Sequence, residues 1–486
     1  MASETLRARL QSPDFSCDAL QISRVTGREA ISRLFSFAIE VVCTDPGGLQ
    51  PDDVIGADAS LVFEQHGEEI RILHGMIAEV DDLFTTETEH SAYRLLLVPR
   101  AHRLTLVDMQ EVFLGTSVPD IVKQKLELVA LGGSDVEMRL LSAYEPREFV
   151  VEYGETDLAF ISRLTEHLGI GFFFDHSGDA DRIVFTDHPA GYRAIEGHER
   201  AAFRTRGEQR DVYRLEHKTR VMPRTWMVQD YNHRSPRLDL TASHQTESGL
   251  AGGVVEYGAH VKTPAEGMAL ARIRAEEREA TCRYYTGESD VCTLTAGARV
   301  TLEGHPRVPE KLLLITEVEH SFAQVTLTHG GSSGGVEPTY HNTFRAVPGD
   351  RPYRPARVTP RPRIAGVLSG VIQPRPGGDI DAHADIDEAG SYTVRFHFDT
   401  SPVDSRPRTS HPIRMSQPLA GPGYGVHFPL RTGVEVLVTF VDGDPDRPVI
   451  QGALPHPVSP SPVTRKNALQ SRIQTQSGIA LILKDR

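Results

Sequence analysis

The sequence predicts a mainly β protein that consists of β-barrel modules with a few inserted helices. Apolar and polar residues alternate in many short runs, and glycine or acidic residues separate these runs, as in antiparallel strands joined by turns. Only three stretches repeat apolar residues at helical spacing. With 486 residues, the chain is too long for one hydrophobic core, so we expect about three or four domains.

The composition is that of a globular protein, and it argues against several partners. The chain is 39% hydrophobic, and 52 basic against 66 acidic side chains give a formal net charge of −14, which disfavours nonspecific binding to nucleic acid or anionic membranes. No apolar run approaches the roughly twenty residues of a membrane-spanning helix, and the N-terminus lacks the apolar core of a signal peptide. We therefore expect a cytoplasmic protein unless a dedicated machine exports it.

The first 345 residues are predicted to form a base of barrel modules. An antiparallel sheet or barrel is expected between residues 20 and 100, and a second set of strands between residues 183 and 257. The clearest alternating runs lie at residues 60–65, 70–83, 93–100, 298–304, 311–322 and 324–329. A short amphipathic helix is predicted over residues 117–131, with Ser117 as its N-cap.

Two further helices interrupt the strands of the base. The first presents one apolar face, formed by Leu158, Ile161, Leu164 and Leu168. It ends at Gly169, before an aromatic strand. The second helix, residues 263–280, begins with Thr263 as its cap and Pro264 in its first turn, and Glu266 is placed to complete a capping box.

A proline-rich stretch, residues 346–364, predicts a stiff extended linker to a second domain. Residues 365–456 are predicted to form a small closed antiparallel barrel, because five or six short apolar runs follow at regular spacing. The runs lie at residues 365–372, 390–399, 411–419, 425–430, 433–441 and 447–454. Two alternating sets are expected to share one face of their strands: Tyr392, Val394, Phe396 and Phe398, and Val434, Val436, Val438 and Phe440.

Three glycines of the second domain suggest a phosphate-binding loop, because glycine lets backbone N–H groups approach an anion. They are Gly421, Gly423 and Gly425. A strand-like run follows them instead of a helix, and Pro422 lacks the N–H group that such a loop would use. We therefore predict a structural role for these glycines.

An acidic turn in the same domain has the opening carboxylate spacing of an EF-hand calcium loop, at Asp442, Asp444 and Asp446. Arg447 stands where the loop requires glycine, and Ala453 stands where a bidentate glutamate should close the site. The simpler interpretation is a tight turn between two strands.

No stretch of the sequence predicts a catalytic centre. The G-x-S-x-G pattern of a serine nucleophile occurs at residues 330–334, around Ser332, but no helix follows it. Carboxylate pairs for glycoside cleavage meet in space rather than at fixed spacing, so that alternative stays open. We predict that the protein is not an enzyme and has no catalytic residues.

Metal and cofactor sites are not predicted either. Four histidines of the second domain follow no ligand spacing: His383, His397, His411 and His427. The four cysteines are scattered, which predicts buried free thiols instead of a zinc site or disulfides: Cys17, Cys43, Cys282 and Cys292.

The last segment, residues 457–486, is predicted to be a connector followed by one strand. Ile473, Ile479, Leu481 and Leu483 share one face of that strand at a period of two residues. A single such strand would expose an apolar face and an unpaired backbone edge to water, which favours association with other chains.

Two long stretches resemble signatures of the VgrG family. Residues 147–176, "REFVVEYGETDLAFISRLTEHLGIGFFFDH", resemble the family's segment in which a helix leads to a glycine and an aromatic strand. Residues 416–454, "SQPLAGPGYGVHFPLRTGVEVLVTFVDGDPDRPVIQGAL", resemble its OB-fold signature. VgrG proteins form the spike of the type VI secretion system and are similar to the hub and spike proteins of contractile phage tails. The resemblance covers nearly the whole chain in the family's order.

The resemblance implies a homotrimer with three parts: a hub-like base, an OB-fold collar and a C-terminal triple-stranded β-helix needle. The implied partners are the stacked ring protein of the inner tube, a cone-shaped tip protein at the apex, and effectors or their adaptors. Nucleic acid is not a partner, and a target membrane is contacted only on firing. Export by the contractile machine needs no signal peptide. The chain departs from the family in that the family's needle continues well past Arg486, and in His397 and Phe398, where the family usually has a tryptophan-type residue.

The predicted function is a structural, membrane-puncturing spike that sits on the inner tube and carries effectors into a target cell. The spike of a related extracellular contractile injection particle stays open as an alternative. A cell-wall hydrolase of the phage lysozyme-spike type would need about a hundred or more inserted residues after the small barrel, where only a short proline-rich connector stands. A carbohydrate- or nucleic-acid-binding OB-fold protein would show exposed aromatic or basic residues on its strands.

Overall fold

The structure is a computed structural model, and it describes residues 6–83, 91–194, 199–204, 211–324, 339–376, 384–402 and 408–484. The chain divides into two compact units. The first unit holds residues 1–106, 122–144 and 161–360, and the second holds residues 107–121, 145–160 and 361–486. Two segments that were predicted to belong to the base, residues 107–121 and 145–160, thus group with the C-terminal part of the chain.

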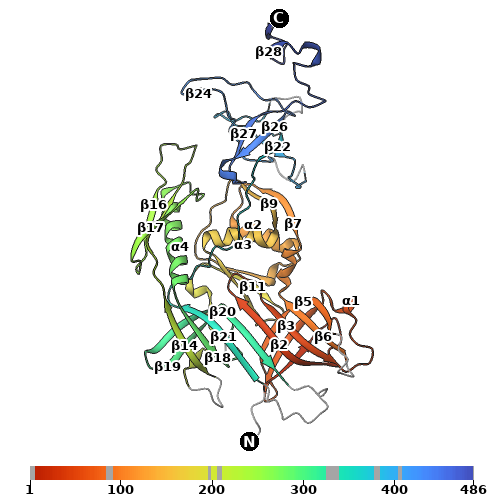
Figure 1. Cartoon of the computed structure of the whole chain (residues 1–486), viewed down its shortest axis with the longest axis vertical. Coiled ribbons are helices and arrows are strands. Elements are labelled where there is room, and N and C mark those ends of the chain that lie inside the picture. The colour runs from red at the N-terminus through yellow and green to blue at the C-terminus, as the bar shows by residue number, and fades with distance from the viewer. Residues whose placement is uncertain are drawn as a thin grey trace. The chain divides into compact units, whose positions relative to one another are not determined.

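The first unit is built on a 13-stranded sheet that curls into two barrels. Figure 1 shows β2, β3, β5 and β6 gathered in one group, and β14, β18, β19 and β21 in another. The first barrel has the strand order β1-β4-β5-β6-β3-β2. Its strands are β1 (Arg7–Gln11), β2 (Leu20–Ala30), β3 (Ser36–Cys43), β4 (Asp58–Gln65), β5 (Glu68–Leu83) and β6 (Ser91–Val98). The predicted alternation is confirmed in β6, where Tyr93, Leu95 and Leu97 are buried, whereas β4 buries Leu61, Val62 and Phe63 in succession.

A second barrel continues from the first, because β2 pairs with β20. Its order is β20-β21-β18-β14, and β19 joins β20 to the short strands β12 and β13. The ring closes where Phe203, next to β13, bridges to Val212 of β14. The strands are β12 (Arg193–Ala194), β13 (Arg200–Ala202), β14 (Val212–Thr219), β18 (Arg283–Ser289), β19 (Ala298–His305), β20 (Val308–Ala323) and β21 (Thr339–Pro348). The barrel modules predicted from alternation are therefore confirmed.

One side chain closes the first barrel. Gln324, which follows β20, accepts a hydrogen bond from the backbone N–H of Ala8 (3.0 Å) and donates to the carbonyl oxygens of Ala8 (3.0 Å) and Ile22 (2.7 Å). Ala8 lies in β1 and Ile22 in β2, the two end strands of this barrel. The Gln324 amide therefore replaces part of the backbone ladder that would otherwise join them.

Replacing Gln324 with leucine should lower the free energy of unfolding by about 1–3 kcal/mol, because polar backbone groups of β1 and β2 lose their partner. Urea unfolding followed by circular dichroism measures this loss. Gln65→Leu, at the end of β4 and half-buried like Gln324, is the matched control and should have a small effect. An unchanged unfolding midpoint in Gln324→Leu would contradict the closing role.

The first two predicted helices are confirmed. α2 (Val118–Leu128) begins after Ser117, whose hydroxyl accepts the N–H of Asp120 at 3.3 Å, as an N-cap does. α3 (Asp157–Leu168) ends at Gly169, which has a φ of +68°, a conformation that glycine adopts without strain. The aromatic strand β10 (Gly171–Asp175) follows and forms a sheet with β11 (Arg182–Thr186) and β8 (Val136–Arg139). The one-turn helix α1 (Pro51–Val54) was not predicted.

The third predicted helix, α4 (Pro264–Cys282), begins at its predicted cap. The Thr263 hydroxyl accepts the N–H of Glu266 at 3.2 Å. The Glu266 carboxylate accepts the N–H of Lys262 at 2.8 Å, so its half of the predicted capping box is shifted by one residue. Figure 1 shows α4 beside β16 and β17. The sheet has the order β16-β15-β17, with β15 (Pro223–Gln229), β16 (Ala242–Gln245) and β17 (Ala251–Tyr257).

The proline-rich stretch has no regular secondary structure between residues 351 and 363. Ion pairs up to Arg357 and hydrogen bonds from Thr359 to Glu166 hold it to the first unit. Arg351, Arg354 and Arg357 recur every third residue, the repeat of a polyproline II helix. Their acidic partners are Glu247 for Arg351 (3.4 Å), Glu276 for Arg354 (2.7 Å), and Glu277 (3.0 Å) and Glu256 (2.9 Å) for Arg357. Residues 351–359 are therefore held against the first unit, and we call them the arginine strap.

The second unit contains the small barrel. Its four-stranded sheet has the order β23-β22-β26-β27, and the run at residues 411–419 adds only isolated bridges, from Ile413 to Tyr392 and from Met415 to Ile450. The strands are β22 (Val367–Ile372), β23 (Val394–Phe396), β26 (Glu435–Phe440) and β27 (Pro448–Ala453). The predicted inward faces are confirmed: Tyr392, Val394, Phe396, Val436, Val438 and Phe440 share one core, with Phe398 and Val434 packed against it.

A ribbon from the N-terminal half packs on this barrel within the second unit. β7 (Asp108–Phe113) and β9 (Val150–Thr156) pair with each other, and Val112, Phe149 and Val151 enter the barrel core. The backbone N–H of Val151 donates to Asp446 at 2.7 Å. This contact explains why segments distant in sequence belong to one compact unit.

Two predicted strands of the second unit differ from the structure. The run at residues 425–430 is no barrel strand but part of an exposed arm, which carries the short pair β24 (Ala420–Gly421) and β25 (Tyr424–Gly425). The single C-terminal strand is wrong, because the chain turns back and forms the antiparallel hairpin of β28 (Gln470–Gln474) and β29 (Ala480–Lys484). Period-two alternation continues through a turn of this length, so it could not locate the reversal.

Candidate functional site

The acidic turn of the second unit is a tight turn between β26 and β27, the geometry that the simpler interpretation predicted. Asp442 has a φ of +57° within the turn Val441–Gly443, a left-handed conformation that aspartate tolerates. Asp444 lies 3.1 Å from the Arg361 guanidinium and accepts the N–H of Asp446 at 3.1 Å. Asp446 in turn accepts the N–H of Val151. These carboxylates have protein partners, so they fix the turn and the ribbon.

The remaining predicted patterns do not converge on a site in the described residues. The serine pattern at residues 330–334 and His383 lie outside the described part of the chain. The other three histidines have different neighbours. The His427 imidazole lies 2.9 Å from the Tyr392 hydroxyl, the His411 ring lies 4.6 Å from the Phe149 ring, and the His397 backbone N–H donates to Ser369.

Exposed apolar side chains are concentrated in the second unit. Of the 26 large apolar side chains that are exposed among the described residues, 14 belong to this unit, although it holds about a third of the chain. Most of them lie beyond the barrel core, and we call them the C-terminal apolar set: Leu419, Tyr424, Val426, Phe428, Val458, Leu469, Ile473, Ile479, Leu481, Ile482 and Leu483. Exposed apolar groups at this density are typical of an association surface.

The C-terminal hairpin carries the densest part of this set. Ile473 lies opposite Leu481, and Ser471 lies opposite Leu483, so Ile473, Leu481 and Leu483 share one face. Within the described residues, no third strand pairs with the hairpin, and its two outer edges stay open. An isolated two-stranded hairpin is marginal in water, and an open apolar edge favours pairing with another chain.

The exposed arm carries the other part of the set. Tyr424, Val426 and Phe428 are 63, 38 and 58% exposed. The base of the arm is fixed, because His427 bonds to the Tyr392 hydroxyl on one side and to the Gln417 amide (2.8 Å) on the other. The arm thus presents apolar side chains from a defined attachment.

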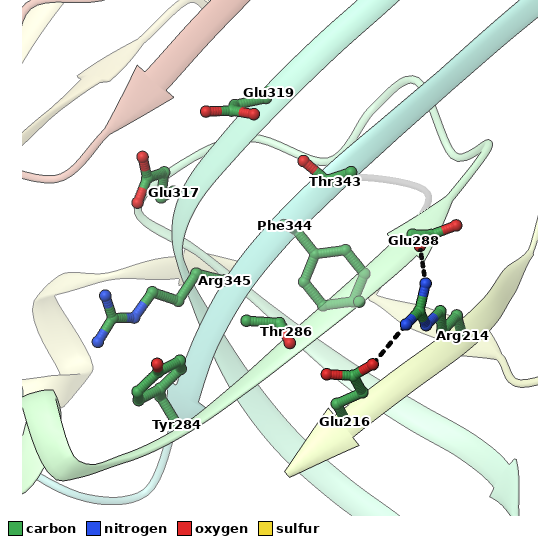
Figure 2. Close-up of a pocket in the computed structure, with 11 residues that line it drawn as sticks. Arg214, Glu216, Tyr284, Thr286, Glu288, Glu317, Glu319, Thr343, Phe344 and Arg345 are labelled. Carbon is green, nitrogen blue, oxygen red and sulfur yellow. Dashed lines mark hydrogen bonds and ion pairs between the residues drawn. The ribbon is translucent and has the colours of Figure 1, made fainter. Parts of the chain in front are cut away.

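A hollow of about 380 Å³ opens on the polar face of the second barrel. Figure 2 shows Arg214 between Glu216 and Glu288, to which it bonds at 2.6 Å each, while Arg345 lies 3.7 Å above the Tyr284 ring. Glu317 pairs with Arg28 of β2 at 2.5 Å. Ion pairs across neighbouring strands are typical of a solvent-facing sheet. The hollow therefore does not point to a ligand.

A buried polar cluster joins the two barrels, and we call it the barrel joint. The Glu29 carboxylate of β2 pairs with Arg71 of β5, and its Oε1 lies 3.1 Å from Nε2 of His320 in β20. Its Oε2 accepts from the Thr295 hydroxyl and from the Ala296 N–H, both in the loop that precedes β19. One carboxylate thus holds strands of both barrels and a loop.

The electrostatics of the barrel joint favour one anion and neutral histidines. Burial alone would raise the pKa of Glu29, but Arg71, His320 and the Thr295 hydroxyl together hold it well below its usual range. Burial and the Arg71 charge lower the pKa of His320, against the opposing effect of Glu29. Burial likewise lowers the pKa of the nearby His176 to about 4. Local spacing offers no signal for this cluster, because its contacts join residues that are tens to hundreds of positions apart.

Comparison with known families shows to which protein family the chain belongs. Residues 28–326 match the phage tail baseplate hub (GPD) family. The chain belongs to the phage tail baseplate hub family. Residues 385–454 of this hub protein match the type VI secretion system/phage-baseplate injector OB domain, which confirms the predicted OB fold of the second unit. None of the helices in the described part combines the length and the apolar character that crossing a membrane requires.

Individual relatives of the hub protein confirm the resemblance to VgrG. It is 29% identical over 486 residues to the type VI secretion system spike protein VgrG1b of Pseudomonas aeruginosa, covering 98% of this chain and 64% of that relative. It is 30% identical over 460 residues to VgrG4b of the same organism, covering 91% of this chain and 55% of that relative. The chain thus spans a little over half to two thirds of the length of these relatives.

A solved structure supports the same fold for the hub protein. The E. coli c3393 protein, described as a component of the type VI secretion system with structural similarity to the T4 bacteriophage tail proteins gp27 and gp5, is 26% identical, with a TM-score of 0.66. The match covers 92% of this chain and 100% of the other. The predicted fold class of hub-like barrels followed by an OB-fold barrel is confirmed.

Proposed function

We propose that this chain is the structural spike component of a type VI secretion system, in which the barrels of the first unit form the base and the second unit begins the spike. The observation that carries the proposal is the C-terminal hairpin, which exposes Ile473, Leu481 and Leu483 on one face and leaves both edges open. A part that bears load at a tip must bury such a hairpin against other chains. The similarity to a spike protein, which extends over 98% of this chain and 64% of that relative, supports this assignment.

The partner that best fits the hairpin is a second and a third copy of the chain, wound about one axis. Identical copies bring the same apolar face and the same open edges. The apolar face of each copy can therefore be buried against the other copies, and its open edges can pair with theirs. A homotrimer of this kind would start the triple-stranded β-helix needle within residues 457–486. The predicted linker (346–364), OB-fold collar (365–456) and needle start belong to the same proposal. The proposed base is the predicted range, residues 1–345, without residues 107–121 and 145–160, which group with the second unit.

Light scattering of the purified 486-residue chain tests the trimer. We expect three times the monomer mass at micromolar concentration. Replacing Leu481 and Leu483 with lysine should shift the mass toward the monomer, because six charges would enter the shared apolar core. Gln474→Lys, on the opposite face of the hairpin, is the control and should leave the trimer intact. A stable monomer of the unmodified chain would exclude the proposed assembly.

The other partners follow from the proposed role: the stacked ring protein of the tube below the base, a cone-shaped protein at the apex, and effectors or their adaptors. The chain is then assembled in the cytoplasm and exported by the contractile machine without a signal peptide. Export should therefore stop when sheath contraction is blocked, while the cellular level of the chain stays unchanged. Export that continues without a working sheath would contradict this route. Release of whole particles into the medium would favour the related extracellular injection particle.

We infer further that the described part of the chain acts without catalysis. The purified chain should not clear peptidoglycan or hydrolyse ester substrates, and Ser332→Ala should change nothing measurable. Turnover that Ser332→Ala abolishes would instead establish the serine pattern at residues 330–334 as a nucleophile.

A further inference from the structure

The barrel joint contains a chain of polar contacts that accommodates a neutral His320. Asn342 donates to the Tyr340 hydroxyl (3.1 Å) and to the carbonyl of Val291 (2.9 Å). The Tyr340 hydroxyl lies 2.7 Å from Nδ1 of His320, and Nε2 of His320 faces Glu29. Since a carboxylate only accepts, Nε2 carries the proton and Nδ1 accepts from Tyr340.

His176 needs the same neutral state. Its Nδ1 accepts the backbone N–H of His74 at 3.1 Å, which a protonated Nδ1 cannot do. His176 is half-buried, and its ring packs against the ring of Phe35 (5.3 Å between centroids). Two histidines of one region thus act as hydrogen-bond acceptors inside the protein.

The loop between β18 and β19 depends on these contacts. Arg71 donates to the carbonyl of Cys292 (2.6 Å), Asn342 donates to Val291, and Glu29 accepts from Thr295 and Ala296. Each bond joins the loop to a member of the barrel joint. The loop is also held to the second barrel by the Gly297 N–H, which donates to Ile315, and by the buried Val291 and Leu294, so the contacts to Glu29 and Arg71 are its attachment to the first barrel.

We propose that the barrel joint is an acid-sensitive latch, which holds the loop at residues 290–297 to the first barrel at neutral pH and releases it in mildly acidic solution. When Nδ1 of His320 gains a proton, the Tyr340 hydroxyl loses its acceptor, and a second cation stands beside Arg71 with one carboxylate between them. A proton on Nδ1 of His176 likewise leaves the backbone N–H of His74 without its acceptor. Opening the joint lets water reach the cations.

Several charged and titratable groups surround the two histidines. His320 is faced by Glu29 of β2, Arg71 of β5 and the Tyr340 hydroxyl of β21. The Cys292 thiol of the loop acts on Tyr340. The charged or titratable groups that act on His176 and His74 are Glu29, Arg71, Asp175, Asp179, Asp181 and Arg100. Asp181 is itself paired with Arg100, at 2.6 Å, so that carboxylate is not free to neutralise a new cation. The only carboxylate bonded to His320 among the described residues is Glu29.

Acid should open the latch, because both histidines are neutral in its closed state. In the closed latch both histidines bind a proton less readily than in water, where their pKa is near 6.5. The open state therefore gains protons first as the pH falls, and acid favours opening. The closed latch is stable above about pH 6.5 and is lost progressively below it.

Selective thiol labelling tests the latch in the full chain without any substitution. Cys292 lies in the loop and Cys43 in β3 of the first barrel, and they are 4 and 3% exposed. A pyridyl disulfide, which still reacts with thiols in acid, is applied between pH 7 and pH 4, and mass spectrometry measures both sites. We expect the labelling of Cys292 relative to Cys43 to rise at least about tenfold, the change that one pKa unit allows. Labelling of both cysteines together, or of neither, would overturn the latch.

Variants then assign the effect to the histidines. His320→Gln and His176→Gln should each reduce the acid-induced labelling of Cys292, because glutamine offers donor and acceptor atoms but does not titrate in this range. His217→Gln removes an exposed histidine of β14 and should leave the pH profile unchanged. Unaltered selective labelling in both joint variants would overturn the assignment. If one variant does not fold, the other variant and the unmodified chain still decide the question.

Discussion

Truncating Phe396 to alanine should lower the free energy of unfolding by about 3–5 kcal/mol, the largest loss expected from any single apolar substitution in the second unit. Phe396 is 1% exposed at the centre of the OB-fold core. Its ring centroid lies 5.0 Å from that of Phe398, 6.1 Å from Phe440 and 6.4 Å from Phe149. The substitution removes these contacts and leaves a cavity that the closed barrel cannot collapse to fill.

Chemical denaturation with near-ultraviolet circular dichroism measures the effect on this unit. Phe428→Ala is the matched control, because Phe428 is 58% exposed on the arm and its truncation should change folding stability little. Phe428 belongs to the C-terminal apolar set, so its truncation should affect association between chains more than folding. The two variants together therefore separate folding from assembly. An unchanged unfolding midpoint in Phe396→Ala would show that its inward orientation is wrong.

Replacing Arg71 with methionine should cost a similar amount, about 3–5 kcal/mol, because it leaves the buried carboxylate of Glu29 without its main cation. Both side chains are nearly inaccessible, at 7% for Arg71 and 6% for Glu29. Arg71 also holds the Cys292 carbonyl of the loop, so the loop loses one of its attachments. Arg214→Met, which breaks two exposed ion pairs, is the control and should cost far less.

The double variant Arg71→Met/Glu29→Gln tests whether the loss of stability comes from the unpaired charge of Glu29. Removing both charges should recover much of the loss, because the penalty comes from the isolated buried charge more than from the missing attraction. The free energies of unfolding of the unmodified chain, the two single variants and the double variant together yield the coupling energy between Arg71 and Glu29. A coupling energy near zero would mean that the two groups do not depend on each other in the folded protein.

The exposed residues of the two units suggest a division of roles within one chain. On the polar face of the second barrel, ion pairs join Arg214 to Glu216 of the same strand and to Glu288 of the neighbouring strand. In the second unit, exposed side chains become apolar beyond the barrel, at the arm and the hairpin. A base with paired surface charges and a tip with open apolar edges suit the proposed spike.

Local spacing predicted much of this protein. Period-two alternation placed Val436, Val438 and Phe440 on the inward face of a strand, and the structure confirms it. The caps at Ser117 and Thr263 and the stop at Gly169 were also predicted, because a cap bonds to residues within one turn. Alternation failed at the C-terminus, where the turn between Gln474 and Ala480 keeps the same period as a strand.

The sequence by itself determined which faces are apolar, where helices begin and end, and the family to which the two long signatures point, since all of these depend on neighbours along the chain. Only the tertiary structure decided that Gln324 closes the first barrel, that the arginine strap lies on acidic residues near α4, and that Glu29 joins both barrels to a loop. Each of these contacts joins residues that are tens to hundreds of positions apart. A glutamine or glutamate in a strand has the same local pattern whether it faces water or a buried partner, so only the folded chain reveals which one it meets.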